Sequence, residues 1–218
     1  MNSTLSYDDF VAFVFDRPKN ENGKKFFFRE DFSEPDLSNT LAIEYICNIF
    51  NDITELAQRF SEWEIVVGLQ YLMDGGCGGL CYAFVSDDVP IENRVTAISL
   101  MNEVFKGLFD KRCANVVDPS DLNTSSFNYL CLVWWDVFPR HGIPRSAQSE
   151  PIDRIILETI SRILSLDNIM CKKSALRGLG LWHSEYSEEV ALSIAGNSLN
   201  IPNCLQEYAH SAAHGDIK

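Results

Sequence analysis

The sequence predicts an all-α protein of antiparallel helices joined by short turns, either stacked as helical pairs or closed into a bundle. Apolar residues recur with a period of 3.6 along most of the chain. Turn-forming residues separate the apolar stripes, and only residues 25–29 are typical of a strand. Because a lone strand has no partner, we expect no sheet of any size.

The first half of the chain carries four of the predicted helical stretches. They span residues 7–15, residues 42–60 as one helix or two joined near Asn51, residues 61–73, and a stripe over 95–108 that follows Pro90. The third is the best defined at its start. Ser61 and Glu64 have the spacing of a capping box, in which the hydroxyl accepts the third N–H and the carboxylate reaches back. The same helix should stop at the Asp74-Gly75-Gly76 sequence.

The second half begins with residues 127–138, which are apolar nearly all round and are therefore expected at the centre of the molecule. Pro151 suits the first turn of the next helix, because its missing N–H costs nothing there. Glu158 and Arg162 on that helix form an i, i+4 pair. Three short helices are then expected, over 174–183, 188–198 and 203–213.

Length and composition favour a single globular domain over residues 1–218. The chain is 46% hydrophobic, which excludes a disordered or low-complexity protein, and it is long enough to bury a core without metals or disulfides. Its net charge of −13 repels phosphate backbones, so nucleic-acid binding is not expected. No secretory signal or membrane-spanning stretch is present, and we expect a cytoplasmic protein without cofactor or metal.

The cysteines fit that compartment. There are seven, an odd number, and none forms a C-x-x-C pair. Most fall inside apolar helical patterns, so we interpret them as free, buried thiols.

Two helices repeat an unusual feature, a glycine inside an apolar stretch. Gly68 lies within Val66–Leu72 and Gly178 within Leu176–Trp182. An interior glycine costs about 1 kcal/mol relative to alanine. We expect close approach of a neighbouring backbone at both positions, which favours stacked pairs over a closed bundle.

Residues 173–217 resemble a HEAT-like or armadillo-like helical repeat. The run Ser174–Gly180 is similar to the start of a HEAT-type helix, and a short helix then precedes the small-residue run Tyr208–Gly215. The similarity covers about the last fifth of the chain. It implies an α-α superhelix of antiparallel hairpins that acts as a scaffold, presents an extended surface to a partner and shares no catalytic residues; uncharacterised bacterial proteins occur in this class.

The motifs that could carry chemistry are incomplete. The glycine-dense residues 74–79 follow a helix and lack the Lys-Ser or Lys-Thr of a phosphate loop, so they predict a helix connection, with a hinge or partner-facing loop as the alternative. His210 and His214 share a helix face at i, i+4. A zinc site there would need a third ligand such as Asp216 or Cys204. We expect an exposed face without metal.

The aromatic residues offer the only candidates for partner binding: Trp134, Trp135 and the neighbouring Asp136. Two consecutive tryptophans on one helix cannot both face the same core. Either one is partly exposed, or both are buried between two layers, as in a stacked solenoid.

Together these features predict a non-catalytic protein–protein interaction module whose acidic surface prefers a basic partner. An immunity-type protein that neutralises a basic toxin is one version. The alternative is an all-α enzyme whose site gathers carboxylates with His141, His183 or the His210–His214 pair. A third hypothesis is a small helical module that only oligomerises.

Overall fold

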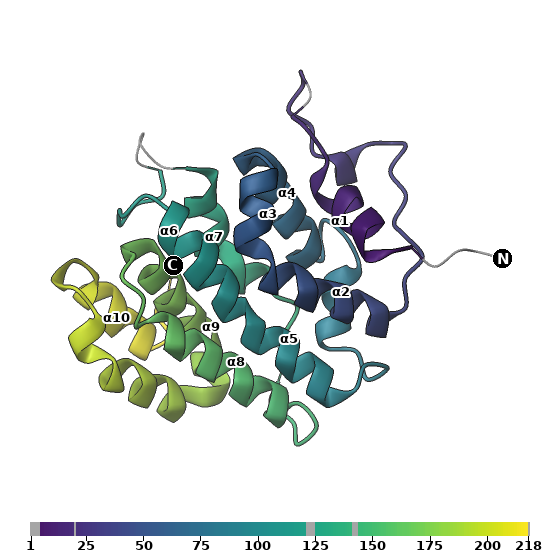
Figure 1. Cartoon of the computed structure of the whole chain (residues 1–218). Coiled ribbons are helices and arrows are strands. Elements are labelled where there is room, and N and C mark those ends of the chain that lie inside the picture. Colours follow the sequence, from purple (N-terminus) through teal and green to yellow (C-terminus); the bar gives the residue numbers. More distant parts are fainter. Residues whose placement is uncertain (1–4, 20, 121–124, 141–143, 218) are drawn as a thin grey trace.

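A computed structural model describes residues 5–19, 21–120, 125–140 and 144–217 (Figure 1). These residues form helices and no strand, which confirms the all-α prediction. The α-helices are α1 (Tyr7–Phe15), α2 (Asn39–Asn51), α3 (Ile53–Arg59), α4 (Glu62–Met73), α5 (Ile91–Val104), α6 (Asp110–Arg112), α7 (Ser126–Val137), α8 (Glu150–Ile163), α9 (Ile169–Gly196) and α10 (Gln206–Ala213). Shorter turns are the 3-10 segments η1 (Phe26–Phe28), η2 (Leu80–Phe84), η4 (Ser198–Asn200) and η5 (Asn203–Leu205), and the π-turn η3 (Phe105–Phe109).

The start of α4 is as the sequence predicts. The Ser61 side chain accepts a hydrogen bond from the Glu64 N–H, and the Ser61 N–H donates to the Glu64 carboxylate at 2.9 Å. The stretch 42–60 resolves into two helices, α2 and α3, because the chain leaves helical geometry at Asp52.

The strand predicted over residues 25–29 is wrong, since this stretch forms the 3-10 turn η1. The reason lies in its aromatic side chains. A strand sends successive side chains to opposite faces. Here the rings of Phe26 and Phe27 are both buried against Tyr71, with centroids 5.1 and 6.0 Å away.

In the last third, the break expected between residues 183 and 188 is observed as a bend, and the short helix expected over 203–213 is present as η5 and α10. Residues 169–196 run as α9, which begins earlier than expected and bends at Tyr186, where φ is −139° and ψ is 44°. The Tyr186 hydroxyl donates to the buried carboxylate of Asp153 on α8 at 2.6 Å. The bend therefore coincides with a contact that no local pattern reveals.

Helices α2, α5 and α8 lie side by side in one layer and run in the same direction. Near the start of α2, the Asn39 side chain donates to Ser86, just before α5. At the other end of that pair, Gly107 lies against Thr54. The ends of α5 and α8 meet where the Asn168 N–H donates to Asp110 at 3.0 Å. The α2–α5 and α5–α8 contacts are among the most extensive in the molecule.

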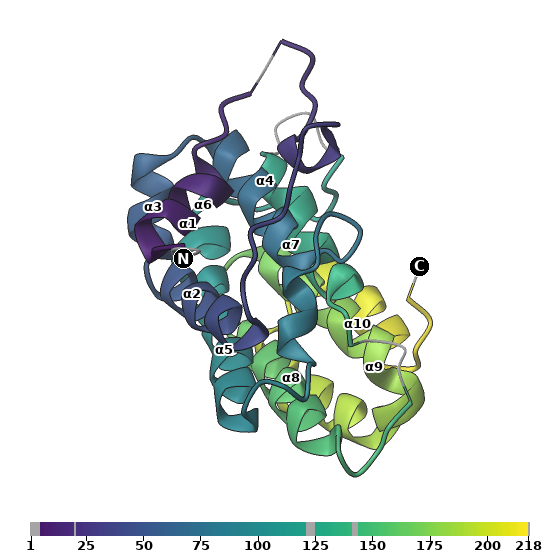
Figure 2. The same cartoon turned by 90° about the vertical axis from the view of Figure 1, so that its right-hand side faces the viewer.

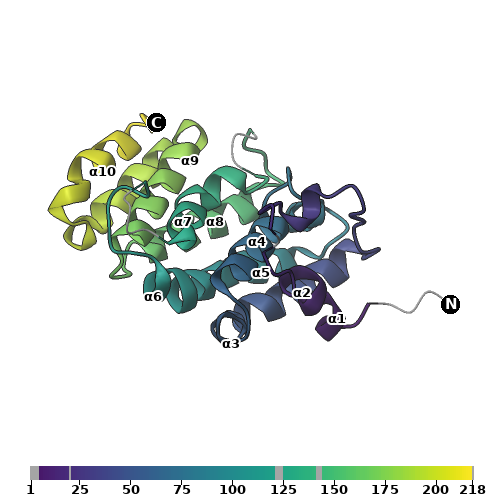
Figure 3. The ribbon, with the colours of Figure 1, turned by 90° about the horizontal axis from the view of Figure 1, so that it is seen from above.

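A second layer consists of α4, α7 and the first part of α9, which also run parallel to one another. The Ser126 N–H donates to Glu62 at 2.6 Å where α7 and α4 begin. Along α9, the Ser174 hydroxyl donates to the Cys131 carbonyl of α7. This layer runs opposite to the first, because its helices begin beside the residues that end α3, α5 and α8. The helices α1 and α10 cover the two ends of the stack (Figure 3).

The two interior glycines are explained by aromatic rings. A Cβ added to Gly68 would overlap the Phe15 ring of α1, and one added to Gly178 would lie 2.8 Å from the Trp135 ring of α7. Close approach is confirmed, but neighbouring side chains rather than a neighbouring backbone make it. The absence of a Cβ at these two positions leaves room for the rings against α4 and α9.

Candidate protein-binding surface

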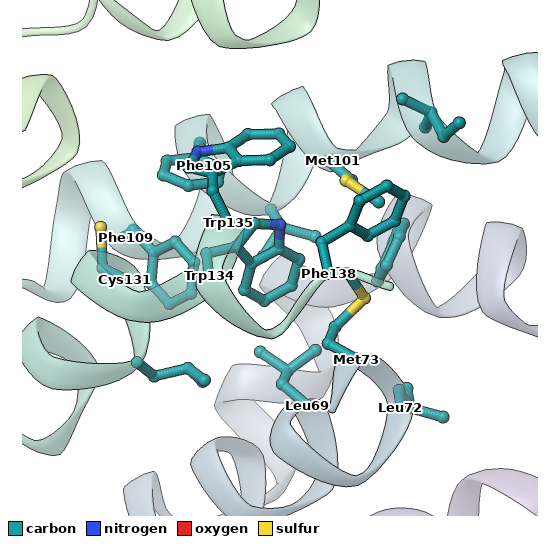
Figure 4. Close-up of a cluster of buried hydrophobic side chains, with 14 of the residues drawn as sticks. Leu69, Leu72, Met73, Met101, Phe105, Phe109, Cys131, Trp134, Trp135 and Phe138 are labelled. Atoms are coloured by element: carbon teal, nitrogen blue, oxygen red, sulfur yellow. The ribbon is translucent and has the colours of Figure 1, made fainter. Parts of the chain in front are cut away.

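Trp134 and Trp135, the predicted anchors, are both buried at 0% exposure at the centre of the molecule (Figure 4). Trp134 lies edge-on to Phe109 with a centroid distance of 5.5 Å and also approaches Phe50 of the other layer. Trp135 stacks on Phe105 at 6.0 Å. Of the two alternatives, burial between layers is therefore the one observed, and neither ring reaches the surface of the folded chain.

Asp136, the third candidate, is occupied by an interhelical ion pair. Its carboxylate accepts two hydrogen bonds from Arg177 of α9, at 2.7 and 2.5 Å. Those hydrogen bonds raise the pKa of the Arg177 guanidinium. The pair joins α7 to α9, so within this structure Asp136 serves an internal contact.

The histidines do not assemble a reactive centre in the part of the chain described here. The His210 and His214 rings lie 4.4 Å apart on an exposed helix end, and His214 Nδ1 is 2.8 Å from the His210 carbonyl oxygen. Across residues 5–19, 21–120, 125–140 and 144–217, no three His, Cys, Asp or Glu side chains are grouped so that they could hold a metal ion. His141 lies outside the described residues.

The seven cysteines are free thiols. All but Cys47 and Cys204 are buried. Burial raises the pKa of Cys47 to about 11 and that of Cys77 to about 12. At neutral pH these two thiols therefore hold very little thiolate, the form that reacts as a nucleophile.

One charged group that the sequence did not point to lies deep in the structure. Asp153 is 0% exposed, and it accepts two hydrogen bonds from Arg140 at 2.7 and 2.8 Å. Tyr186 donates to the same carboxylate at 2.6 Å, and Ser149 at 3.0 Å. These partners lie on or beside α7, α8 and α9, so the cluster holds the three helices together.

The surface offers a clearer candidate, which we call the acidic edge. It consists of the exposed carboxylates of Glu34, Asp36, Asp87, Asp88 and Glu92. Two chain segments carry these carboxylates, residues 34–36 and 87–92, and a third segment, at Gly79, contacts the first. The Gly79 N–H donates to Glu34 at 2.7 Å, and the side chains of Asn39 and Thr40 donate to the loop before α5 at 3.1 and 3.5 Å. Figure 2 looks onto the extended stretch before α2 that carries the first two carboxylates.

Tyr82 on η2 gives the acidic edge an aromatic neighbour. Its side chain is 53% exposed, and its hydroxyl lies where a Cβ on Gly75 would come within 2.6 Å. The ring therefore rests on the glycine-dense loop. Exposed tyrosines bordered by polar residues are common anchors of protein interfaces, because they bury a large rigid area while keeping a hydrogen-bonding end.

The glycine-dense residues 74–79 are the only part of this region that the sequence patterns singled out. Residues 74–79 were expected to connect helices, and they do join α4 to η2. Local patterns do not reveal the contact between Gly79 and Glu34, because these residues are 45 positions apart along the chain. Only the paired loops before α2 and α5 bring these carboxylates to one side.

Comparison with known proteins adds no relative. No family model, no curated protein and no solved structure matches this chain. Among the described helices, none combines the length and apolar character needed to cross a membrane.

Proposed function

We propose that this chain is a non-catalytic protein-binding module whose acidic edge, with Tyr82 as anchor, docks a basic protein partner. The observation that carries the proposal is the gathering of five exposed carboxylates from two segments, 34–36 and 87–92, next to a half-exposed aromatic ring. Unlike charges steer association and select the partner, while the ring supplies buried area.

The fold we propose is a short α-α superhelix of the HEAT-like kind, with α2, α5 and α8 in one layer and α4, α7 and α9 in the other. The layer contacts support it, because α5 separates α2 from α8 and α7 separates α4 from α9. In a closed bundle, the outer helices would meet. Stacked pairs contact only their neighbours and leave long surfaces for partners.

The proposal makes a specific demand on charge. Among the described residues, the acidic edge contains one ion pair, between Arg94 and Asp87 at 3.3 Å. Asp88 and Glu92 are left for a partner's cations. An immunity-type protein that neutralises a basic toxin is one instance of this function.

The test is capture of a basic protein from native extract by the immobilised chain at low ionic strength. We expect Asp88→Lys and Tyr82→Ser to lose the captured partner. Glu188→Lys is the matched control, because it reverses an exposed carboxylate on α9, away from the acidic edge, and should retain the partner. A partner lost equally in Asp88→Lys and Glu188→Lys, or one insensitive to salt, contradicts the proposal.

A further inference from the structure

Residues after α1 line an open hollow of about 330 Å³. Most of its charged lining residues are positive, which is unusual in a chain with a net charge of −13. Four of its lining residues are cationic and one is a carboxylate. They are Arg17, Lys19, Lys24, Arg29 and Asp16, and the apolar part of the wall includes Phe26 and Trp63. A small site of one sign focuses the field and raises the local concentration of oppositely charged ligands.

Arg17 is held in place at this hollow. Its Nε–H donates to the Phe13 carbonyl at 2.8 Å, and its guanidinium lies over the rings of Phe13 and Phe26 at 4.9 and 5.1 Å. These contacts fix the guanidinium without neutralising it. A preorganised cation loses less conformational entropy when a ligand binds.

Lys19 completes the cationic wall, with its ammonium 5.1 Å from the centroid of the Trp63 ring. Within the described residues, neither Arg17 nor Lys19 forms an ion pair with a carboxylate. Arg29 differs, because Asp31 pairs with it at 2.7 Å. Arg17 and Lys19 are therefore the charges best placed for an external anion.

A second hollow of about 210 Å³ shares Arg17, Phe26 and Arg29 with the first. Its lining adds the hydroxyl-bearing Ser33 and the carboxylate of Asp31, which is paired with Arg29. The Arg17 guanidinium thus borders both spaces, and an anion bound beside it can have groups in either.

We propose that this pair of hollows binds a small phosphate-bearing molecule, with Arg17 and Lys19 as the groups that hold the phosphate. A guanidinium matches the tetrahedral oxygens of phosphate through its fork of N–H donors. Across the two hollows, four cations face two carboxylates, Asp16 and the Arg29-paired Asp31. The remaining positive charge suits a multiply charged anion, and the volume suits a small molecule. The chain's net charge of −13 disfavours a long nucleic acid.

The experiment titrates the full chain with inorganic pyrophosphate at low salt, followed by calorimetry and tryptophan fluorescence. Trp63 is partly buried at the hollow, whereas Trp134, Trp135 and Trp182 are buried elsewhere. We expect saturable binding with a Kd below about 1 mM. Trp63→Phe should abolish the fluorescence change and keep the calorimetric signal.

Charge-removing variants then locate the site. Arg17→Gln and Lys19→Gln should each weaken pyrophosphate binding roughly tenfold, as expected for loss of a charge-assisted contact. Lys106→Gln is the matched control, an exposed lysine on η3 that should bind as the unaltered chain does. If Arg17→Gln does not fold, as judged by circular dichroism, the Lys19→Gln variant still tests whether pyrophosphate binds in the hollow, because Lys19 is exposed.

Three results would overturn the inference: no saturable binding of pyrophosphate, equal weakening in Lys106→Gln and Lys19→Gln, or citrate binding as tightly as pyrophosphate. The last result would show that the hollow recognises charge without recognising phosphate. The proposed docking of a basic protein stands or falls separately, because it uses residues of the acidic edge.

Discussion

Two arginines in this molecule sit beside aromatic rings and have opposite surroundings. Arg140, at the junction of α7, α8 and α9, lies 5.7 Å from the Trp182 ring and directs two hydrogen bonds to the buried Asp153. Arg17, beyond α1, lies over Phe13 and Phe26 at the edge of an open hollow. Arg140 is thus neutralised by a buried carboxylate, whereas Arg17 keeps its charge beside an open hollow.

The difference shows that burial and charge balance, rather than residue type, separate structural from binding groups. At the α7–α9 junction, a charge taken out of water must have its partners in the chain, since an unpaired buried charge costs several kcal/mol. In the hollow, water and neighbouring rings surround the cation. The predictions below test that contrast, beginning with the junction.

Asp153→Ala should have the largest effect, because it leaves the Arg140 guanidinium buried without its carboxylate. We expect a loss of roughly 3–5 kcal/mol in the free energy of unfolding. Urea denaturation monitored by circular dichroism measures it. A loss below about 1 kcal/mol would mean that the junction relaxes and hydrates Arg140.

Gly178→Ala should come next, because the new methyl group would overlap the Trp135 ring at the same junction. Overfilling a well-filled core typically costs about 1–3 kcal/mol. Gly196→Ala is the control, since nothing lies within 4 Å of its added Cβ; it should be neutral or stabilise α9 by up to about 1 kcal/mol. Equal effects at both glycines would contradict the ring-against-glycine contact.

Tyr186→Phe should cost about 1–2 kcal/mol at pH 7, because it removes one hydrogen bond to the Asp153 carboxylate. Burial, with that hydrogen bond, raises the pKa of Tyr186 above its ordinary value of 10.0. The folded chain therefore holds the phenolic proton more tightly than the unfolded chain, and this stabilisation is lost as the pH rises above about 10. The variant should lose stability less steeply than the unaltered chain between neutral and alkaline pH.

Arg17→Gln should have the smallest effect on folding. The guanidinium makes one hydrogen bond and two ring contacts at a partly open position, so we expect a change within about 1 kcal/mol. The same variant is expected to lose pyrophosphate affinity. A loss of stability comparable to that of Asp153→Ala would abolish the contrast between the two arginines.

Local patterns predicted the helical elements well where the signal was local. The capping box at Ser61, the helix from Tyr7 to Phe15 and the central helix around Trp134 all occur as expected. The strand over 25–29 failed because a distant residue decided it: Tyr71 packs against the rings of η1. The break expected between 183 and 188 occurs as the bend at Tyr186, whose hydroxyl donates to Asp153 of α8.

The candidate sites depended even more on tertiary contacts. Trp134 and Trp135 were predicted as anchors because a sequence shows aromatic side chains but does not show which of them are buried. Conversely, the acidic edge needs Glu34 beside Gly79, and the cationic hollow needs Lys19 beside Trp63. These pairs are 45 and 44 residues apart, respectively, and no periodicity links them.

By itself, the sequence determined that this chain is helical, acidic and able to form an apolar core. Helix period and capping depend on residues close together in the chain, and composition is read directly from the sequence. Only the tertiary structure decided which tryptophans are covered, which carboxylate is enclosed and which cations face an open space. Those outcomes depend on the order in which helices stack. Stacking joins groups through contacts between residues far apart in the chain, and their free energies do not appear in any local stretch.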